Sequence, residues 1–460
     1  MQRRESSVSD ILKGFLDTVH SIVTRRYCAM KSEIIDDKPP SSGKNDKPLG
    51  RNVILLGITS FFTDISSEMI YPLVQAFVSL VLKSAGSLIA PVLGIIEGIA
   101  EATASLLKVY AGLISDRMKV RKPMTISGYS LSALSKLIYL LAGFGWGFIL
   151  LSRFMDRIGK GIRTAPRDAL IAESVGGGLR GKAFGYHRAM DYAGAFLGVL
   201  ICYFISSKLV DPREGTIVDI QGFYQLFLIS LIPAFLGVAA LLFIREKTYK
   251  ADPQDKPVVP LSFRLLDGRL KLFFISVFLF TLGNSSNQFL LMRSMDMGVS
   301  LPDVLLMYMV FNLVTSLLST PLGGVSDRIG RKRVILAGYL LYSLIYFLFG
   351  LMPGRPYYLL WFFWAGYGMY YALTEGVEKA LVSELAPEDR RATALGLFSA
   401  VTGITLLPAS LIAGFLYSFA GKAYPFYFGS LMSLLAVVIM GLFLKESRPG
   451  GTADRGIVNS

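Results

Sequence analysis

Cysteine and histidine are scarce in this chain of 460 residues, which holds two of each. Cys28 and Cys202 are too few to form a disulfide framework or a thiolate metal site. His20 and His187 are too few for a histidine-based metal centre, so we expect neither a metal nor another cofactor. The sequence also lacks a G-x-x-x-x-G-K-[ST] loop, a G-x-S-x-G and an H-E-x-x-H. These absences disfavour ATP-driven transport and a membrane enzyme.

Charged residues are sparse as well, at 17% of the chain, whereas hydrophobic residues make up 53% and the mean hydropathy is +0.51. This composition is too apolar for a soluble protein of this length. About 20 consecutive apolar residues cross a bilayer core as a helix, and the chain offers roughly twelve such stretches. We therefore expect an all-α integral membrane protein. The predicted spans are Asn52–Leu82, Leu88–Ser115, Pro123–Ala142, Trp146–Ile171, Lys182–Ile205, Gly222–Ile244, Lys271–Met292, Pro302–Ser326, Val334–Leu351, Tyr357–Leu381, Ala392–Phe419 and Tyr424–Leu444.

One short string occurs twice. Gly112–Lys122 reads GLISDRMKVRK and Gly323–Arg333 reads GGVSDRIGRKR, so the second copy starts 211 residues after the first. A constant offset across separate patches indicates two homologous halves of roughly 200 residues each. The same offset relates two further groups, Ala169, Leu170 and Glu173 with Ala380, Leu381 and Glu384, and Arg180, Ala183 and Gly185 with Arg391, Ala394 and Gly396.

Basic residues outnumber acidic ones by 47 to 33, which gives a net charge of +14. They gather in alternate connections between the predicted spans, as at Arg117–Lys122 and Arg328–Arg333, and do not form one basic patch. This distribution disfavours nucleic-acid binding. Because cytoplasmic loops of membrane proteins are enriched in Lys and Arg, we expect a multi-pass protein of the inner cell membrane with both termini in the cytoplasm.

Polar segments divide the chain into five parts. Apolar residues between Ile11 and Val23 recur at helical spacing, which predicts an amphipathic helix on the membrane surface; a disordered tail is the alternative. The expected parts are a cytoplasmic N-terminal tail (1–50), an N-terminal six-helix half (51–244), a cytoplasmic central loop (245–270), a C-terminal six-helix half (271–445) and a cytoplasmic tail (446–460).

The doubled G-x-x-x-D-R-x-x-x-[RK]-[RK] signature resembles that of the major facilitator superfamily (MFS) of secondary transporters, over about Asn52–Leu444. In that family it lies in the cytoplasmic loops between helices 2 and 3 and helices 8 and 9, where both copies fall here. The resemblance implies twelve transmembrane helices in two pseudo-symmetric six-helix halves around a central cavity. It also implies transport by rocking of the two halves about a midplane site.

Two further family patterns match in part. Arg157 and Gly161 keep the spacing of an Arg and a Gly that the family usually carries in helix 4, so Arg157 joins the residues expected to act in conformational change. Gly198 keeps its place in the glycine series of helix 5, but Val199 replaces the proline that many antiporters have there. The departure weakens an inference of antiport.

The repeated string places an aspartate beside a cation at each predicted helix end. Asp116 precedes Arg117 and Asp327 precedes Arg328. A carboxylate at such a place can pair with a cation or with the N-terminus of a neighbouring helix. Such contacts can form and break between conformations, so we expect these four residues to act in gating. The alternative is that the charges only fix the orientation in the membrane.

Ionisable residues inside the spans are costly and usually functional. In the resembled family, helices 1, 4, 7 and 10 line the cavity. We predict a substrate and proton cavity from charged and amide residues near the middle of the spans, since an acid there holds its proton tightly enough to exchange it near neutral pH. The alternative is a set of structural ion pairs, such as Glu101 with Lys136. The candidates are Asp64, Glu68, Glu97, Glu101, Lys136, Arg153, Asp156, Asn284, Asn287 and Glu375.

The repeat also pairs charges of opposite sign. The 211-residue offset relates Arg167 to Glu378 and Asp168 to Lys379, near the cytoplasmic ends of helices 4 and 10. In the resembled family these ends approach each other when the cavity opens outward. We predict that Arg167–Glu378 and Asp168–Lys379 are ion pairs that close an inner gate. The alternative is that each dipeptide pairs within its own half or faces water.

Together these features predict a secondary active transporter that moves a small organic solute with protons, efflux being favoured over uptake. The alternative is a non-transporting receptor or scaffold with the same fold, which would tolerate a cavity without titratable acids. The expected partners are the solute, protons and membrane lipid, with no nucleic acid, and a monomer is favoured. Cations in the cavity permit an anionic or zwitterionic solute, and acids permit a cation.

Overall fold

Inside a bilayer no water is available to bond the backbone, so an apolar run must satisfy its own amide and carbonyl groups, as a helix does. The computed structural model describes residues 49–81, 104–105, 107–209, 220–246, 267–284, 287–299, 301–352 and 358–444, and every regular element in these ranges is helical. The elements belong to one unit, Gly50–Ser460. They are α2 (Arg51–Val81), α4 (Lys122–Ser135), η2 (Lys136–Phe144), α5 (Trp146–Glu173), η3 (Gly177–Leu179), α6 (Arg180–Leu209), α7 (Ile220–Leu242), α8 (Gly268–Gly283), α9 (Gln288–Asp296), α10 (Leu301–Ile329), α11 (Arg331–Leu351), α12 (Tyr358–Leu385), η5 (Glu388–Arg390), α13 (Arg391–Phe415), η6 (Leu416–Ala420) and α14 (Tyr424–Phe443), together with the helical residues 107–118.

Several predicted features fall outside the described residues. They are the amphipathic helix of the N-terminal tail, Glu97 and Glu101, most of the central loop, and the C-terminal tail. The end predicted for the central loop, residue 270, is too late by about one helical turn, because α8 begins at Gly268.

Seven of the described helical segments are long and apolar enough to cross a membrane. The other long helices contain charges or breaks. α5 carries a row of charged residues between Arg153 and Asp168, and α4 continues into the 3₁₀-helical η2. The seven segments are Arg51–Ile70, Gly177–Ile205, Gln221–Leu242, Leu306–Ile329, Arg331–Leu351, Glu388–Phe415 and Tyr424–Phe443.

The span predicted as Lys271–Met292 is interrupted. α8 ends at Gly283 and α9 begins at Gln288. Tyrosine hydroxyls bond groups at the interruption: Tyr342 donates to the carbonyl oxygen of Gly283 over 2.9 Å, and the Asn284 amide donates to the Tyr370 hydroxyl over 3.0 Å. Broken helices of this kind occur in transporters where backbone lines a cavity.

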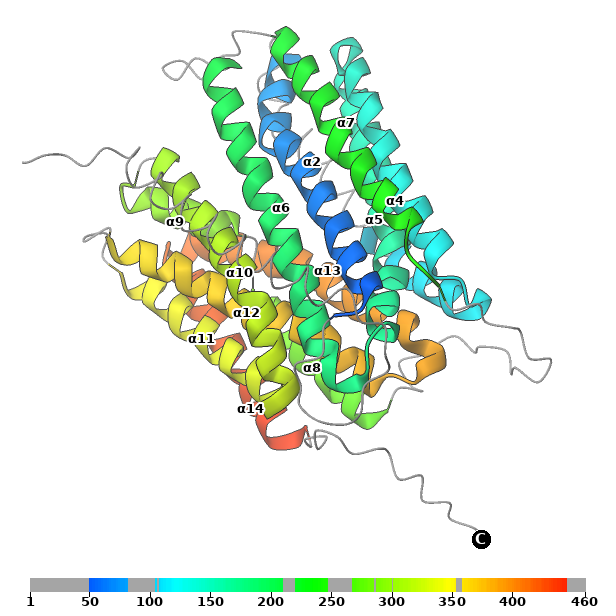
Figure 1. Cartoon of the computed structure of the whole chain (residues 1–460). Coiled ribbons are helices and arrows are strands. Elements are labelled where there is room, and N and C mark those ends of the chain that lie inside the picture. The colour runs from blue at the N-terminus through cyan, green and yellow to red at the C-terminus, as the bar shows by residue number, and fades with distance from the viewer. Residues whose placement is uncertain are drawn as a thin grey trace, which may run out of the picture. The chain divides into compact units, whose positions relative to one another are not determined.

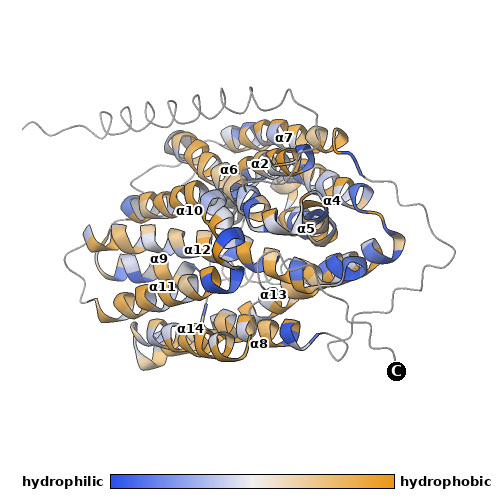
Figure 2. Cartoon of the chain, turned by 60° about the horizontal axis from the view of Figure 1, so that its bottom comes forward, coloured by the Kyte–Doolittle hydropathy of each residue, from blue (hydrophilic) through white to orange (hydrophobic). Residues whose placement is uncertain are grey.

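The helices fall into two groups that follow the chain (Figure 1). In the N-terminal group α2 packs on α6 and α7, and α4 packs on α5; in the C-terminal group α10 and α11 pack on α12, and α14 packs on α8 and α11. Between the groups, α6 packs along α10, and α13 contacts α5. Figure 2 shows hydrophilic stretches of α5 and α12 toward the middle of the view, whereas α7, α11 and α14 are mostly hydrophobic.

Glycines bring the two groups into backbone contact at one end of the bundle, which we call the motif end because both copies of the repeated string lie there. A Cβ on Gly323 of α10 would collide with the carbonyl oxygen of Gly181 of α6. By the 211-residue offset the equivalent contact joins Gly112 and Ala392, and there too a Cβ would collide with a carbonyl oxygen. The motif end therefore contains two related seams, α6 with α10 and residues 107–118 with α13.

Candidate functional site

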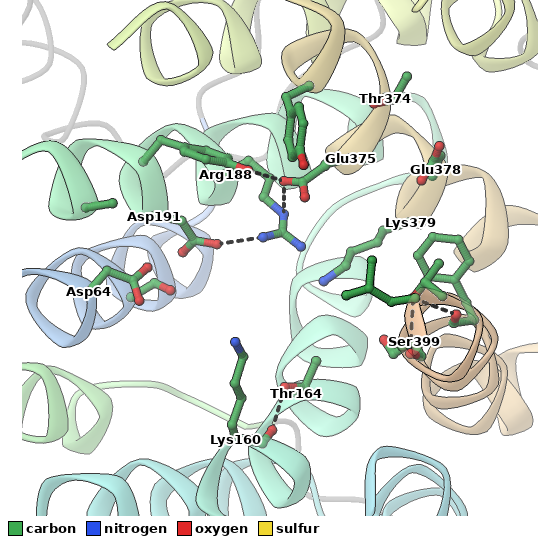
Figure 3. A pocket seen from close by; sticks show the side chains of 18 of the residues that line it. Asp64, Lys160, Thr164, Arg188, Asp191, Thr374, Glu375, Glu378, Lys379 and Ser399 are labelled. Carbon is green, nitrogen blue, oxygen red and sulfur yellow. Dashed lines mark hydrogen bonds and ion pairs between the residues drawn. The ribbon is translucent and has the colours of Figure 1, made fainter. Parts of the chain in front are cut away.

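A cavity of about 490 Å³ lies between the two groups of helices, and both groups line it. Its lining is unusually charged for a membrane protein, where an ionised group needs a partner or water. In Figure 3 the side chains of Asp64, Lys160 and Lys379 are directed into this space. The charged lining residues are Asp64, Glu68, Lys108, Lys160, Arg163, Arg167, Arg188, Asp191, Glu375, Glu378 and Lys379.

Arg188 joins the two halves across the cavity. Its guanidinium lies 3.2 Å from Asp191 of the same helix and 3.5 Å from the Glu375 carboxylate of α12. Tyr192, one turn along α6, donates its hydroxyl to the same carboxylate over 3.0 Å. Asp191 also lies 3.4 Å from His187 Nδ1. These contacts bring acids, a histidine and a tyrosine into one connected group that spans both halves. Figure 3 shows Arg188 between Asp191 and Glu375.

One face of α5 supplies cations to the cavity. Lys160, Arg163 and Arg167 follow the i, i+3, i+7 spacing that places residues on one side of a helix. Tyr129 of α4 supports two of them: the Arg163 guanidinium lies 4.2 Å above its ring, and Arg167 donates to its hydroxyl over 3.3 Å. The ring therefore holds this basic face in place.

Asp168 lies behind the cavity, with 1% of its surface exposed. Lys379 Nζ is 2.5 Å from one of its oxygens, and Arg167 bonds the other over 2.8 Å. The predicted Asp168–Lys379 pair is therefore present. The predicted Arg167–Glu378 pair is not found, because Arg167 turns to its neighbour Asp168, while Glu378 accepts the Tyr339 hydroxyl over 2.9 Å.

The two aspartates of the repeated string cap helices of the opposite half. Asp116 accepts the backbone amides of Ala392 and Thr393 over 3.2 and 2.6 Å, at the start of α13. Asp327 accepts those of Gly181 and Lys182 over 2.8 Å each, at the start of α6. A helix N-terminus leaves amides without an intrahelical partner, and a carboxylate satisfies them.

Each capping aspartate also binds an arginine of its own half. Arg121 lies 2.6 Å from Asp116, and Arg331 lies 2.8 Å from Asp327. Arg121 and Arg331, and not the adjacent Arg117 and Arg328, make these pairs, and Arg117 and Arg328 are exposed. A gating role for Arg117 and Arg328 stays a prediction.

The structure places only some of the predicted cavity residues in the lining. Asp64, Glu68, Asn284 and Glu375 line it. Lys136 lies elsewhere, because its ammonium bonds Ser66 and Ser67 of α2. Asn287 also lies outside the lining and accepts the hydroxyls of two tyrosines of α12, Tyr367 and Tyr371.

Two further predicted cavity residues, Arg153 and Asp156, are not in the lining, and neither is Arg157, which was predicted to act in conformational change. They precede Lys160 on α5 by one to two turns, about 5–10 Å along the axis. Arg157 keeps its family spacing to Gly161, and its conformational role stays a prediction.

The sequence prediction missed several lining residues. They are Lys108, Lys160, Arg163, Arg188 and Asp191. The prediction took no residue from helix 5, which is α6, and from helix 4 it took Arg153 and Asp156 instead of Lys160 and Arg163. From helix 2 it took Glu97 and Glu101 instead of Lys108. The i, i+3, i+7 spacing of Lys160, Arg163 and Arg167 was a usable signal, and so was the pair Arg188 and Asp191 on one face of α6.

This fold and this cavity define a multi-pass membrane transporter. The profile of the Major Facilitator Superfamily matches residues 56–314 and 273–458, and the chain belongs to that family. It is 36% identical over 419 residues to the uncharacterized MFS-type transporter MJ1317 of Methanocaldococcus jannaschii, covering 89% of this chain and 99% of the relative. Members of the family bind small-molecule substrates and often use protons.

A second relative and a solved structure are also similar to this chain. Multidrug resistance protein 2 of Bacillus subtilis is 33% identical over 137 residues, which is 29% of this chain and 33% of that protein. The solved structure of the MFS proton:xylose symporter XylE, bound to 6-bromo-6-deoxy-D-glucose, matches with a TM-score of 0.69 and 16% identity, over 86% of this chain and 96% of that one. The structural match shows the shared fold.

Proposed function

We propose that the protein is a proton-coupled carrier that exports a small organic solute across the inner cell membrane by alternating access. The observation that carries the proposal is the acid-rich, cation-rich cavity bridged between halves by Arg188 and Glu375. A proton or solute that binds one partner of this pair changes the attraction between the halves. The Bacillus subtilis relative is named for multidrug resistance, which supports export, and XylE is a proton symporter, which supports a proton as the coupling ion.

Alternating access needs a closure between the halves at one side of the cavity, and the contacts at the motif end supply it. Asp116, Asp327 and the Asp168–Lys379 pair all join one half to the other. In the conformation described, these contacts hold the motif end closed. Opening toward that side requires all of them to break, so ligand and proton binding must weaken at least one.

The first test concerns proton coupling. Asp64 lines the cavity on α2, and a carboxyl group in such a place can take up and release the coupling proton. We expect Asp64→Asn to insert normally but to lose accumulation of solute driven by a pH gradient, measured as flux in proteoliposomes. Asp267→Asn, at a half-exposed position outside the cavity, should keep wild-type flux. Gradient-driven accumulation at the wild-type level in Asp64→Asn would refute the role of Asp64.

The second test concerns orientation, because we propose that the motif end and both termini face the cytoplasm. Arg117 at the motif end and Phe144, the last residue of η2, are exposed residues of the same half. In a chain with Cys28→Ser, we expect a cysteine at Arg117 to react with an impermeant thiol reagent only in inside-out vesicles, and one at Phe144 only in right-side-out vesicles. The reverse pattern would overturn the proposed orientation.

A further inference from the structure

Lys379 lies between the cavity and the buried carboxylate of Asp168. Its ammonium lines the cavity, and Figure 3 shows it directed into that space. The same ammonium lies 2.5 Å from Asp168, which is buried and does not belong to the cavity lining. An anion bound in the cavity therefore competes with Asp168 for one cation.

The charges around Lys379 favour such an anion. The side chain of Lys160 enters the same space from α5 (Figure 3). Three of the five lining acids have partners shown above: Asp191 and Glu375 bind Arg188, and Glu378 accepts a tyrosine hydroxyl. The other two, Asp64 and Glu68, belong to α2. A lipophilic cation would have to lie against two ammonium groups in a poorly solvated site, which is unfavourable.

Asp168 keeps a cation when Lys379 leaves it. Arg167 holds one of its oxygens by two hydrogen bonds of 2.8 and 2.9 Å. Removing one partner from a buried ion pair usually leaves an uncompensated charge, which is strongly destabilising. Here Arg167 removes most of that cost. The arrangement thus allows Lys379 to exchange Asp168 for a ligand while every charge stays paired.

We propose that the substrate carries an anionic group, a carboxylate or a phosphate, that binds Lys379 and Lys160 and displaces Asp168. Because Asp168 belongs to the N-terminal half and Lys379 to the C-terminal half, binding removes an ion pair between the halves and favours opening of the motif end. The inference rests on the proposed transport function and names the class of its substrate.

The test measures the affinity of the purified full-length chain in nanodiscs for citrate, inorganic phosphate and tetraphenylphosphonium by titration calorimetry. We expect citrate or phosphate to bind and tetraphenylphosphonium not to bind, and the two anions distinguish a carboxylate site from a phosphate site. Lys379→Gln should abolish anion binding. Asp168→Asn should tighten it about tenfold, since the internal competitor is gone; tenfold corresponds to about 1.4 kcal/mol. Arg333→Gln, an exposed cation on α11, is the matched control and should bind as the wild type does.

Asp168→Asn is the decisive variant. If Asp168 competes with the anion for Lys379, the variant binds the anion more tightly, whereas if the Asp168–Lys379 pair only supports the structure, the variant binds the anion more weakly. Unchanged or weaker anion affinity in this variant overturns the proposal. It is also overturned if the wild type binds tetraphenylphosphonium but neither citrate nor phosphate. If Asp168→Asn does not fold, Lys160→Gln is measured instead and should bind the anion more weakly. An anion affinity within twofold of the wild type would then overturn the proposal. A carrier that transports tetraphenylphosphonium along a pH gradient would refute the substrate class and leave the proposed transport function intact.

Discussion

Exchanging Asp168 and Lys379 should close the motif end again after either single replacement has opened it. Asp168→Lys alone places a third cation beside Arg167 and Lys379, and Lys379→Asp alone places a second acid beside Asp168. Placing like charges in contact at a buried site costs several kcal/mol, which shifts a two-state equilibrium by roughly a hundredfold or more. The double variant restores one acid and one cation in contact.

The measurement is the labelling rate of a cysteine at Ser326, in a chain without Cys28 and Cys202. Ser326 is 1% exposed and lies at the seam of α6 with α10. Both single variants should label roughly a hundredfold faster than the parent chain, because only the open population reacts. The double variant should return to the parent rate, yet transport should stay low, since Lys379 no longer faces the cavity. Equal labelling of the double and single variants at normal expression would exclude a gating role. Asp267→Arg, which breaks an exposed pair worth about 0–1 kcal/mol, is the control.

The sequence was informative where the signal repeats along the chain. The 211-residue offset identified Asp116 and Asp327 as equivalent, and the structure gives them equivalent partners at the starts of α13 and α6. The same offset related Asp168 to Lys379, which are in contact. Duplicated halves pack with pseudo-twofold symmetry, so residues equivalent in sequence meet across the interface.

Where packing selects among several partners, the sequence was not enough. The sequence offered Arg167 two acids, its neighbour Asp168 and the equivalent-position residue Glu378. Arg167 bonds Asp168, and the hydroxyl of Tyr339, which is distant in sequence, bonds Glu378. The interruption after Gly283 also depends on a distant residue, Tyr342, which supplies a hydrogen bond there. No pattern within Lys271–Met292 predicts that a hydroxyl of another helix donates there. Side-chain contacts between helices decide such cases, and local periodicity does not record them.

Replacing either capping aspartate by leucine should have an effect as large as breaking the Asp168–Lys379 pair. Asp327→Leu removes the acceptor of two backbone amides of α6 and the charge partner of the buried Arg331. Asp116→Leu removes the acceptor of two amides of α13 and of the Thr393 hydroxyl, which lies 2.6 Å away. Arg121 keeps Glu173 as a partner and Arg331 keeps Glu384, so the main loss lies in the backbone amides, at about 1–3 kcal/mol for each buried group left unsatisfied. Asp116→Leu should be the more severe, because it loses one hydrogen bond more.

The cysteine at Ser326 distinguishes a rigid-body opening from a local one. Ser326 lies on the seam capped by Asp327, and Asp116 belongs to the other seam. If the halves move as rigid bodies, both seams part together, so Asp116→Leu should raise labelling at Ser326 as strongly as Asp327→Leu does. Faster labelling in Asp327→Leu alone would mean that each cap holds only its own helix. Asp389→Leu, which removes an exposed acid that pairs with its neighbour Arg390, should leave the rate unchanged. A general effect of losing one acidic residue would appear in all three variants, whereas a capping role confines it to Asp116 and Asp327.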